Sequence, residues 1–228
     1  MTLSIPVIAI DGPGGSGKGT IAQLLSRKLG WHLLDSGAMY RIVGLAAVKA
    51  GIDLDDEAAL ALLAEQMNVR FCEGQIGEPA TVILDNEDIS DSVRTEQAGE
   101  YASRVAVHGK VRQALVQRQR DFAQAPGLVA DGRDMGTVIF ADAPLKIYLT
   151  ASAEARAERR YKQLMKKGES VSLPALLEDV RRRDERDMQR LVAPLKPADD
   201  AIQLDSTTMG IEEVLQTVFT LIQTRGLL

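Results

Sequence analysis

A glycine-rich segment with one lysine, GPGGSGKGT (residues 12–20), has the residue types and spacing best suited to chemistry in this sequence. It follows the apolar run Ile5–Ile10 and precedes Thr20–Leu29, whose apolar residues recur at helical spacing. Glycines allow backbone angles at which successive N–H groups converge on phosphate oxygens, and a helix N-terminus attracts anions. The spacing therefore predicts a triphosphate-binding loop, in which Lys18 contacts the β- and γ-phosphates. Thr20 is placed to contact Mg²⁺, directly or through water.

Two further polar segments follow buried strands, DSGAMYR (35–41) and DGRDMGT (131–137). Asp131 suits a carboxylate that holds the water shell of Mg²⁺. Arg133 can bind a phosphate with two parallel N–H groups, and Asp134 can accept a hydrogen bond from the amino group of a base. An ordinary Asp-Gly turn is the alternative for this second segment. In the first segment, Ser36 and Arg41 could bind substrate, and plain helix capping by Asp35 or Ser36 is an equally good interpretation.

Two charged helices carry arginines that could close over a transferring phosphoryl group and stabilise its negative charge. One face of the first helix carries Arg156, Arg159 and Arg160. One face of the second carries Arg183, Asp187 and Arg190. Solvent-exposed salt bridges are the alternative interpretation for such helices. We prefer that alternative for the second helix's other charges, which are Arg181, Arg182, Asp184 and Glu185.

The elements that must position these residues alternate between strand and helix, which indicates an α/β fold with a parallel sheet. The expected strands are 5–10, 32–34, 128–130, 146–149 and 201–204. The expected helices are 20–29, 40–50, 55–66, 100–123, 153–167, 173–190 and 211–224. Strands at 69–71 and 81–84, around turns at 73–79 and 85–88, interrupt this alternation and predict a β-containing insertion at about 66–100.

Composition excludes several classes of protein. A net charge of −5 over 228 residues disfavours binding to a nucleic-acid polymer. A single cysteine permits no internal disulfide and no four-cysteine zinc lid. The sequence shows no signal-peptide pattern and no apolar run of the ~20 residues that a membrane span needs, so we expect a cytoplasmic protein with no membrane partner.

The motifs together resemble those of the bacterial cytidylate kinases, within the P-loop nucleoside monophosphate kinases, over almost the whole chain. They are IDGPGGSGKGT, LLDSGAMYR, ADGRDMGTV, RRRDERDMQRLVAPL and LDSTTMGIEEV. The resemblance implies a three-layer α/β/α kinase core forming a single domain over 1–228. The insertion would enlarge the monophosphate-binding region, and a short helical lid would lie at about 154–170. The implied monomeric enzyme transfers the γ-phosphoryl group of ATP to CMP or dCMP, and poorly to UMP, with Mg²⁺.

The resemblance also implies roles for individual residues. The ATP-binding residues would be Gly12, Pro13, Gly14, Gly15, Ser16, Gly17, Lys18, Gly19 and Thr20. The CMP-binding residues would be Ser36, Gly37, Tyr40, Arg41, Ser103, Arg112, Arg133, Asp134, Asp187 and Arg190. The catalytic residues would be Lys18, Arg133, Arg183, Arg156 and Arg160. Thr20 would contact Mg²⁺ directly or through water, and Asp131 would hold its water shell.

Three alternatives remain open at this point. A kinase of another small acceptor, such as AMP, dTMP or a coenzyme precursor, would share the glycine-rich loop and differ in its acceptor residues. A nucleotide-switch GTPase would also share the loop, although the sequence has no Asn-Lys-x-Asp motif for guanine. A regulatory module would bind ATP and transfer nothing.

Overall fold

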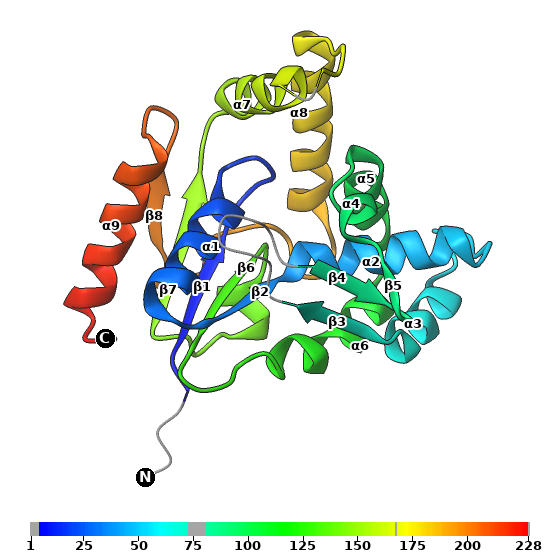
Figure 1. The fold of residues 1–228 in the computed structure, drawn as a ribbon, viewed down its shortest axis with the longest axis horizontal. Coiled ribbons are helices and arrows are strands. Elements are labelled where there is room, and N and C mark those ends of the chain that lie inside the picture. The colour runs from blue at the N-terminus through cyan, green and yellow to red at the C-terminus, as the bar shows by residue number, and fades with distance from the viewer. Residues whose placement is uncertain (1–4, 73–80, 167, 228) are drawn as a thin grey trace. The chain divides into compact units, whose positions relative to one another are not determined.

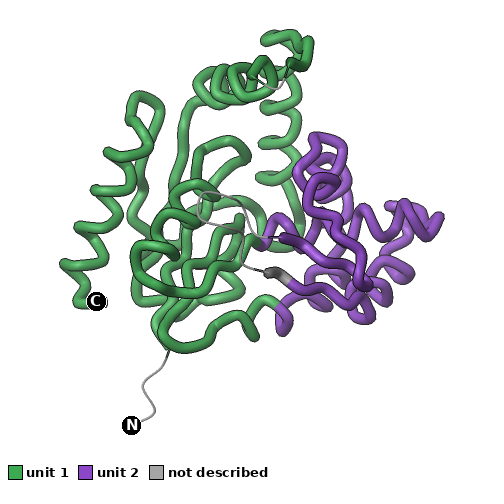
Figure 2. The backbone as a smooth tube through the Cα atoms, in the orientation of Figure 1, with its two compact units in different colours: residues 1–35, 119–228 green, residues 36–118 purple. Residues whose placement is uncertain are grey.

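The computed structural model describes residues 5–72, 81–166 and 168–227, which divide into two compact units (Figure 2). Unit 1 consists of the described residues within 1–35 and 119–228, and unit 2 of those within 36–118. The glycine-rich loop and the two arginine-bearing helices belong to unit 1. The expected insertion, 66–100, is part of unit 2, and its turn-rich stretch at 73–79 lies outside the described residues.

Within the described residues, five strands of unit 1 form one parallel sheet in the order β2-β6-β1-β7-β8 (Figure 1). Their bounds are β1 (Val7–Asp11), β2 (His32–Asp35), β6 (Leu128–Gly132), β7 (Leu145–Thr150) and β8 (Ile202–Asp205). The expected α/β class with a parallel central sheet is confirmed. Asp35 and Asp131 are register partners at the ends of β2 and β6. Asp11 ends β1 beside them, so three carboxylates lie at the carboxyl edge of the sheet.

The helices of unit 1 are α1 (Lys18–Leu29), α7 (Ala153–Lys166), α8 (Leu173–Gln189) and α9 (Ile211–Thr224). The apolar faces of α1 and α9 pack against the central strands, with Leu25 and Val218 in the same buried cluster as Ile8 and Ile147. The helix α1 begins at Lys18, two residues before the expected start at Thr20, because Gly17 takes the left-handed backbone conformation at the N-cap. Among the described residues, none of the helices has the length and hydropathy needed to cross a membrane.

Unit 2 is built from helices and a small antiparallel sheet. The helices are α2 (Ser36–Lys49), α3 (Glu57–Gln66), α4 (Ser90–Val93), α5 (Glu96–Val105) and α6, which runs from Gly109 to Arg120 across the unit boundary. The sheet has the order β3-β4-β5, with β3 (Val69–Cys72), β4 (Thr81–Leu84) and β5 (Glu87–Asp88). Asp85 and Asn86 both have positive φ angles, of 49° and 70°, which is typical of a two-residue hairpin turn. The turn expected at 85–88 is therefore confined to these two residues, because Glu87–Asp88 form β5 instead.

The prediction of one helix over Glu100–Ala123 is wrong. The chain forms α5 and α6 instead, with a break at 106–108. The Arg112 side chain donates to Ala106 O at 3.2 Å, and a nitrogen of His108 lies 2.8 Å from Leu54 O. Gly109, a weak helix former, begins the second helix. In a continuous helix Ala106 O would accept from Lys110 N, but here Lys110 N donates to Glu57 Oε1 at 2.9 Å. The contacts with Glu57 and Leu54 hold the break from outside the helix, so it is fixed by tertiary structure.

Candidate active site

The glycine-rich loop leaves β1 and enters α1, as the sequence predicts. Gly12 has φ +153°, and a Cβ atom added to it would lie 2.0 Å from Leu149 O on β7. Only glycine fits there, because the loop begins in direct contact with a neighbouring strand. The loop ends at Gly17, whose left-handed conformation turns the chain into α1. The N-terminal N–H groups of α1, which lack partners within the helix, make this end attractive to an anion.

Lys18 is buried at the first position of α1. Its ammonium group donates to Pro13 O at 3.4 Å and lies 3.7 Å from Asp131 Oδ1. Burial lowers the pKa of Lys18 to about 8, and the positive charge of Arg133 acts in the same direction, while Asp131 opposes both. The structure therefore places a desolvated cation between the loop and the end of β6. Such a cation interacts strongly with a phosphate because little water screens it.

Asp131 and Thr20 are the residues expected to serve Mg²⁺. Burial raises the pKa of Asp131 to about 6, against the opposing charge of Lys18. Its buried Oδ1 has no hydrogen-bond partner among the described residues, and the Thr20 side chain is exposed. No group of three or more His, Cys, Asp or Glu side chains in the described part of the chain could hold a metal by itself. The oxygen donors fit a Mg²⁺ ion that takes its other ligands from nucleotide phosphates and water.

Asp11, which sequence reasoning missed, organises the segment after β6. Its two carboxylate oxygens accept from Met135 N and Gly136 N, both at 2.8 Å. Those N–H groups begin η1 (Met135–Ile139), a single wide turn of helix capped by the buried Asp134. Burial raises the pKa of Asp11 to about 7, although the two N–H donors oppose the rise. A signal was present in the sequence, because Asp11 ends a buried strand just as Asp131 does.

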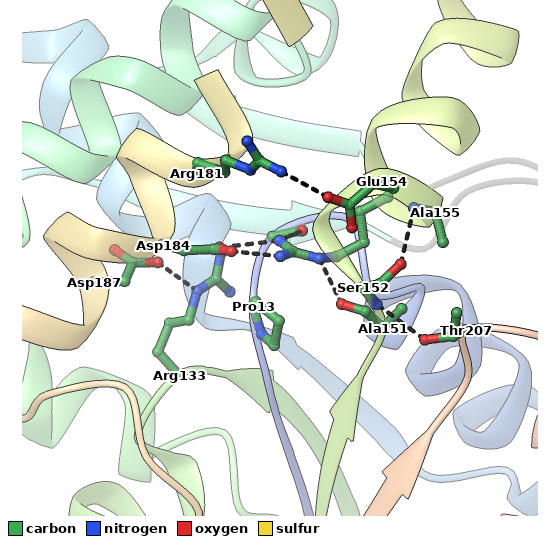
Figure 3. A network of polar contacts seen from close by, with 12 residues as sticks. Pro13, Arg133, Ala151, Ser152, Glu154, Ala155, Arg181, Asp184, Asp187 and Thr207 are labelled. Atoms are coloured by element: carbon green, nitrogen blue, oxygen red, sulfur yellow. Dashed lines mark hydrogen bonds and ion pairs between the residues drawn. The ribbon is translucent and has the colours of Figure 1, made fainter. Parts of the chain in front are cut away.

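Three arginines of the predicted site surround Asp187 in unit 1, and two of them lie near the loop. Arg133 Nε donates to Asp187 Oδ2 at 2.9 Å, and both side chains are largely buried (Figure 3). Burial would raise the pKa of Asp187, but the charges of Arg133, Arg190 and Arg183 outweigh it and hold the pKa below its ordinary value. A Cβ atom on Gly14 would lie 3.5 Å from Arg133 and 3.8 Å from Arg183. Arg133 and Arg183 therefore lie directly against the loop.

The arginines of α7 are placed differently from one another. Arg156 is buried and contacts Gly14 O and Asp184, whereas Arg160 contacts Gln163 on its own helix. Arg159, to which the family resemblance gave no role, donates to Ser16 O at 3.3 Å. The prediction that Asp184 lies on a solvated face is wrong, because its side chain is only 15% exposed and pairs with Arg156.

The exposed positions expected for Arg181 and Arg182 are confirmed. Arg181 pairs with Glu154, and Arg182 pairs with Asp179, with all four side chains more than half exposed.

In unit 2, four of the residues expected to bind CMP are buried, and two of them are in contact. The Arg112 guanidinium lies over the Tyr40 ring, 5.4 Å from its centroid, and both residues are buried. Ser36 is also buried, and so is Ser103. The buried Ser103 hydroxyl has no hydrogen-bond partner among the described residues.

Two more expected CMP-binding residues lie on α2. Gly37 is its second residue. Arg41 donates from Nη1 to Val93 O at 2.7 Å, at the end of α4. The structure therefore shows Arg41 bonded to a helix carbonyl of its own unit.

Comparisons with known proteins were made for the whole chain. The family model described as cytidylate kinase matches residues 8–224. The cytidylate kinase of Stutzerimonas stutzeri (strain A1501) is 59% identical over 227 residues, which cover 100% of this chain and 99% of that protein. The cytidylate kinase of Pseudomonas paraeruginosa (strain DSM 24068 / PA7) is 61% identical over 218 residues, which cover 96% and 95%.

Proposed function

Because this chain belongs to the cytidylate kinase family and transfers the γ-phosphoryl group of ATP to CMP, we propose that Lys18, Arg133 and Arg183 stabilise the phosphoryl group during transfer. The arrangement of these cations around the glycine-rich loop is the observation that supports this assignment. Lys18 is a desolvated charge at the start of α1, and the two arginines lie within 4 Å of the space beside Gly14. Charge spread over a transferring phosphoryl group is stabilised by such pre-placed cations.

The proposed reaction needs no strong general base. A phosphate oxygen of CMP, already anionic, attacks the γ-phosphorus of ATP in line, and the bond between that phosphorus and the ADP oxygen breaks. CDP and ADP are the products, and no proton has to be removed from the attacking atom. The protein's task is therefore to position the two nucleotides and to neutralise charge.

On the donor side, we assign ATP to the glycine-rich loop, residues 12–20, with the triphosphate against the loop N–H groups and Lys18. Mg²⁺, as the cofactor bound with ATP, would neutralise charge on the β- and γ-phosphates. The Thr20 hydroxyl would contact it directly or through water, and Asp131 would hold its water shell. Arg160 is assigned to the phosphates as a residue of the lid at 154–170.

On the acceptor side, we assign recognition of cytosine to Ser36, Ser103 and Arg112 of unit 2 and to Asp134 of unit 1. A carboxylate that accepts from the exocyclic amino group favours cytosine over uracil, which has a carbonyl oxygen there. The same substrate preference makes dCMP a good acceptor and UMP a poor one. Residues assigned to the CMP phosphate and ribose are Arg41, Arg133, Arg183, Asp187 and Arg190, with Gly37 and Tyr40 lining the nucleotide.

We further propose that the enzyme acts as a monomer in the cytoplasm. Every residue assigned to the reaction comes from one chain, so no second copy is needed to complete the site. ATP as donor and a single cysteine in 228 residues both fit a reducing, ATP-supplied compartment.

The direct test is ADP production with ATP and Mg²⁺ against CMP, dCMP, UMP, AMP, GMP and dTMP, each with a control lacking acceptor. We expect rapid turnover with CMP and dCMP and slow turnover with UMP. Fast turnover with AMP or dTMP would overturn the proposed recognition of cytosine. ADP release without acceptor would indicate an ATPase.

The role of Asp134 can be tested separately. Asp134→Ala should lower kcat/KM for CMP much more than for UMP, because only cytosine offers it an amino group. The exposed Asp142→Ala serves as the matched control. An unchanged ratio of the two kcat/KM values would remove Asp134 from base recognition.

A further inference from the structure

The guanidinium of Arg156 is occupied by acceptors of the protein itself. Its Nε donates to Ala151 O at 2.9 Å, and its Nη1 donates to Gly14 O at 2.9 Å and to Asp184 Oδ1 at 3.0 Å. Its Nη2 donates to Asp184 Oδ2, which completes a bidentate ion pair. These contacts use four of the five N–H groups that a guanidinium has. Figure 3 shows this network, with Asp184 of α8 on one side and Ala151 after β7 on the other.

One turn further along α7, Arg159 holds the next part of the loop. Its Nη1 lies 3.3 Å from both Ser16 O and Ser206 Oγ, and its Nη2 donates to Ser206 O. The Ser206 hydroxyl also lies 3.2 Å from Ser16 O. Two carbonyl groups of the glycine-rich loop, those of Gly14 and Ser16, are therefore bonded to arginines of α7.

The chemistry of a phosphate-binding loop explains why these carbonyls matter. When successive N–H groups turn toward a phosphate, the carbonyls of the same peptides turn away and need other donors. A cation bonded to a carbonyl also polarises its peptide and makes the N–H on the other side a stronger donor. Packing supports the contact between Arg156 and the loop, since a Cβ atom added to Gly15 would lie 3.3 Å from Arg156 Cβ.

We propose that Arg156 is a positioning residue for the phosphates shared by ATP and ADP, and that it acts through the Gly14 carbonyl while Asp184 holds it in place. Arg156 does not reach the transferred γ-phosphoryl group. Its side chain is 5% exposed, and its N–H groups are directed to the loop, to Ala151 and to Asp184. The helices α7 and α8 thereby set the shape of the loop. This inference rests on the proposed role of residues 12–20 in ATP binding.

ADP binding tests this proposal, because ADP lacks the γ-phosphate. Calorimetric titration would compare the wild type with Arg156→Lys and Asp184→Asn. Lysine keeps the charge but cannot make the four contacts, and asparagine keeps the shape but loses the charge of the pair. We expect the Kd for ADP to rise about tenfold in each variant, as the loss of a charge-assisted hydrogen bond would give. The double variant should bind no more weakly than the poorer single variant, because both changes break one unit.

Arg181→Lys is the matched control. Arg181 also joins α8 to α7, through Glu154, but its side chain is 63% exposed and it does not contact the loop. The Arg181→Lys variant should bind ADP with the same affinity as the wild type. Thermal unfolding without nucleotide would confirm that each variant is folded. If the Arg156→Lys variant is unfolded, the Asp184→Asn variant alone tests the proposal.

The outcomes separate this inference from the proposed function. If the wild type binds ADP and the Arg156 and Asp184 variants bind it equally well while kcat falls, Arg156 acts on the γ-phosphoryl group and the inference is wrong. If the wild type itself does not bind ADP, the role of the loop in ATP binding fails first. A higher KM for ATP in both variants, with kcat reduced less, would support the inference.

Discussion

Asp187→Asn should destabilise this enzyme more than any loss of a surface ion pair. The substitution preserves side-chain shape and removes the negative charge that Arg133 contacts at 2.9 Å. Three arginines hold the pKa of Asp187 below its ordinary value of 3.8, although burial by itself would raise it. Without that charge, Arg133 remains buried beside Lys18 and Arg183 with less compensation.

The size of the effect follows from burial. Breaking a buried ion pair by removing one partner costs about 3–5 kcal/mol, because the other charge stays desolvated. The lower figure applies here, since 16% of the Arg133 side chain is exposed and the charges of Asp131 and Asp11 also reach it. For a chain of this length about 3 kcal/mol lowers the unfolding temperature by roughly 6–12 °C.

Thermal and urea unfolding of the wild type and the variant would measure this loss. The matched control is Asp179→Asn on the same helix, whose partner Arg182 is 58% exposed, and it should show a small fraction of the effect. The contribution of Asp187 is complete above the pKa of the unfolded chain and is lost as the pH falls through the lower pKa of the folded state. The difference between wild type and variant should therefore stay constant between about pH 5 and about pH 8, and shrink only in stronger acid.

A result equal to that of the control would refute this reasoning, since it would mean that water or another carboxylate already compensates Arg133.

Stabilisation by inorganic phosphate provides a second check. Inorganic phosphate should stabilise the Asp187→Asn variant more than the wild type, because an anion that binds only the folded state offsets the missing charge. Equal stabilisation of both proteins would show that the cation cluster is not left uncompensated.

Three other predictions follow from single residues. Lys18→Ala should nearly abolish turnover while the fold survives, and in the wild type kcat/KM for ATP should fall above about pH 8, where Lys18 loses its proton; a flat profile would contradict this. Gly12→Ala should prevent stable folding, because the added Cβ would lie 2.0 Å from Leu149 O, whereas Gly210→Ala meets no atom within 4 Å; equal yields of folded protein would contradict this. Wild-type stability relative to Asp11→Asn should fall as pH rises from about 4 to about 7, since the folded state holds this proton longer than the unfolded chain does; parallel unfolding curves would contradict it.

The strand, loop and helix that bind phosphate could be predicted because their signals are local. A buried strand, a run of glycines and a helical period follow one another, and each fixes its own backbone without help from distant residues. The same holds for β4 and α9, whose bounds match the expected 81–84 and 211–224. The break between α5 and α6 could not be predicted in this way. It depends on a nitrogen of His108 beside Leu54 O, a contact between residues 54 positions apart in the sequence.

Among the residues around the glycine-rich loop, the sequence predicts groupings along one helix but not the partner of each side chain. Helical spacing places Arg183 and Asp187 on one face of α8, and Arg190 is the residue directly after that helix. Both arginines lower the pKa of Asp187, as the predicted grouping requires. Asp11 was missed because a strand-end carboxylate can serve a ligand or the backbone equally well. In the structure it serves the backbone, since both of its oxygens accept from N–H groups of η1.

Arg156 and Asp184 make the deeper point about reading arginines from a sequence. A helical face rich in arginine beside a phosphate-binding loop looks the same whether its guanidinium groups bind the phosphate or the carbonyls behind it. Both uses need a planar group with several donors, so residue type and spacing cannot separate them. The separating fact is the number of N–H groups that the protein already uses, which for Arg156 is four. Its partner Asp184 lies in a run of charges that resembles a solvated helix face, and only the approach of α7 to α8 brings that carboxylate against the Arg156 guanidinium.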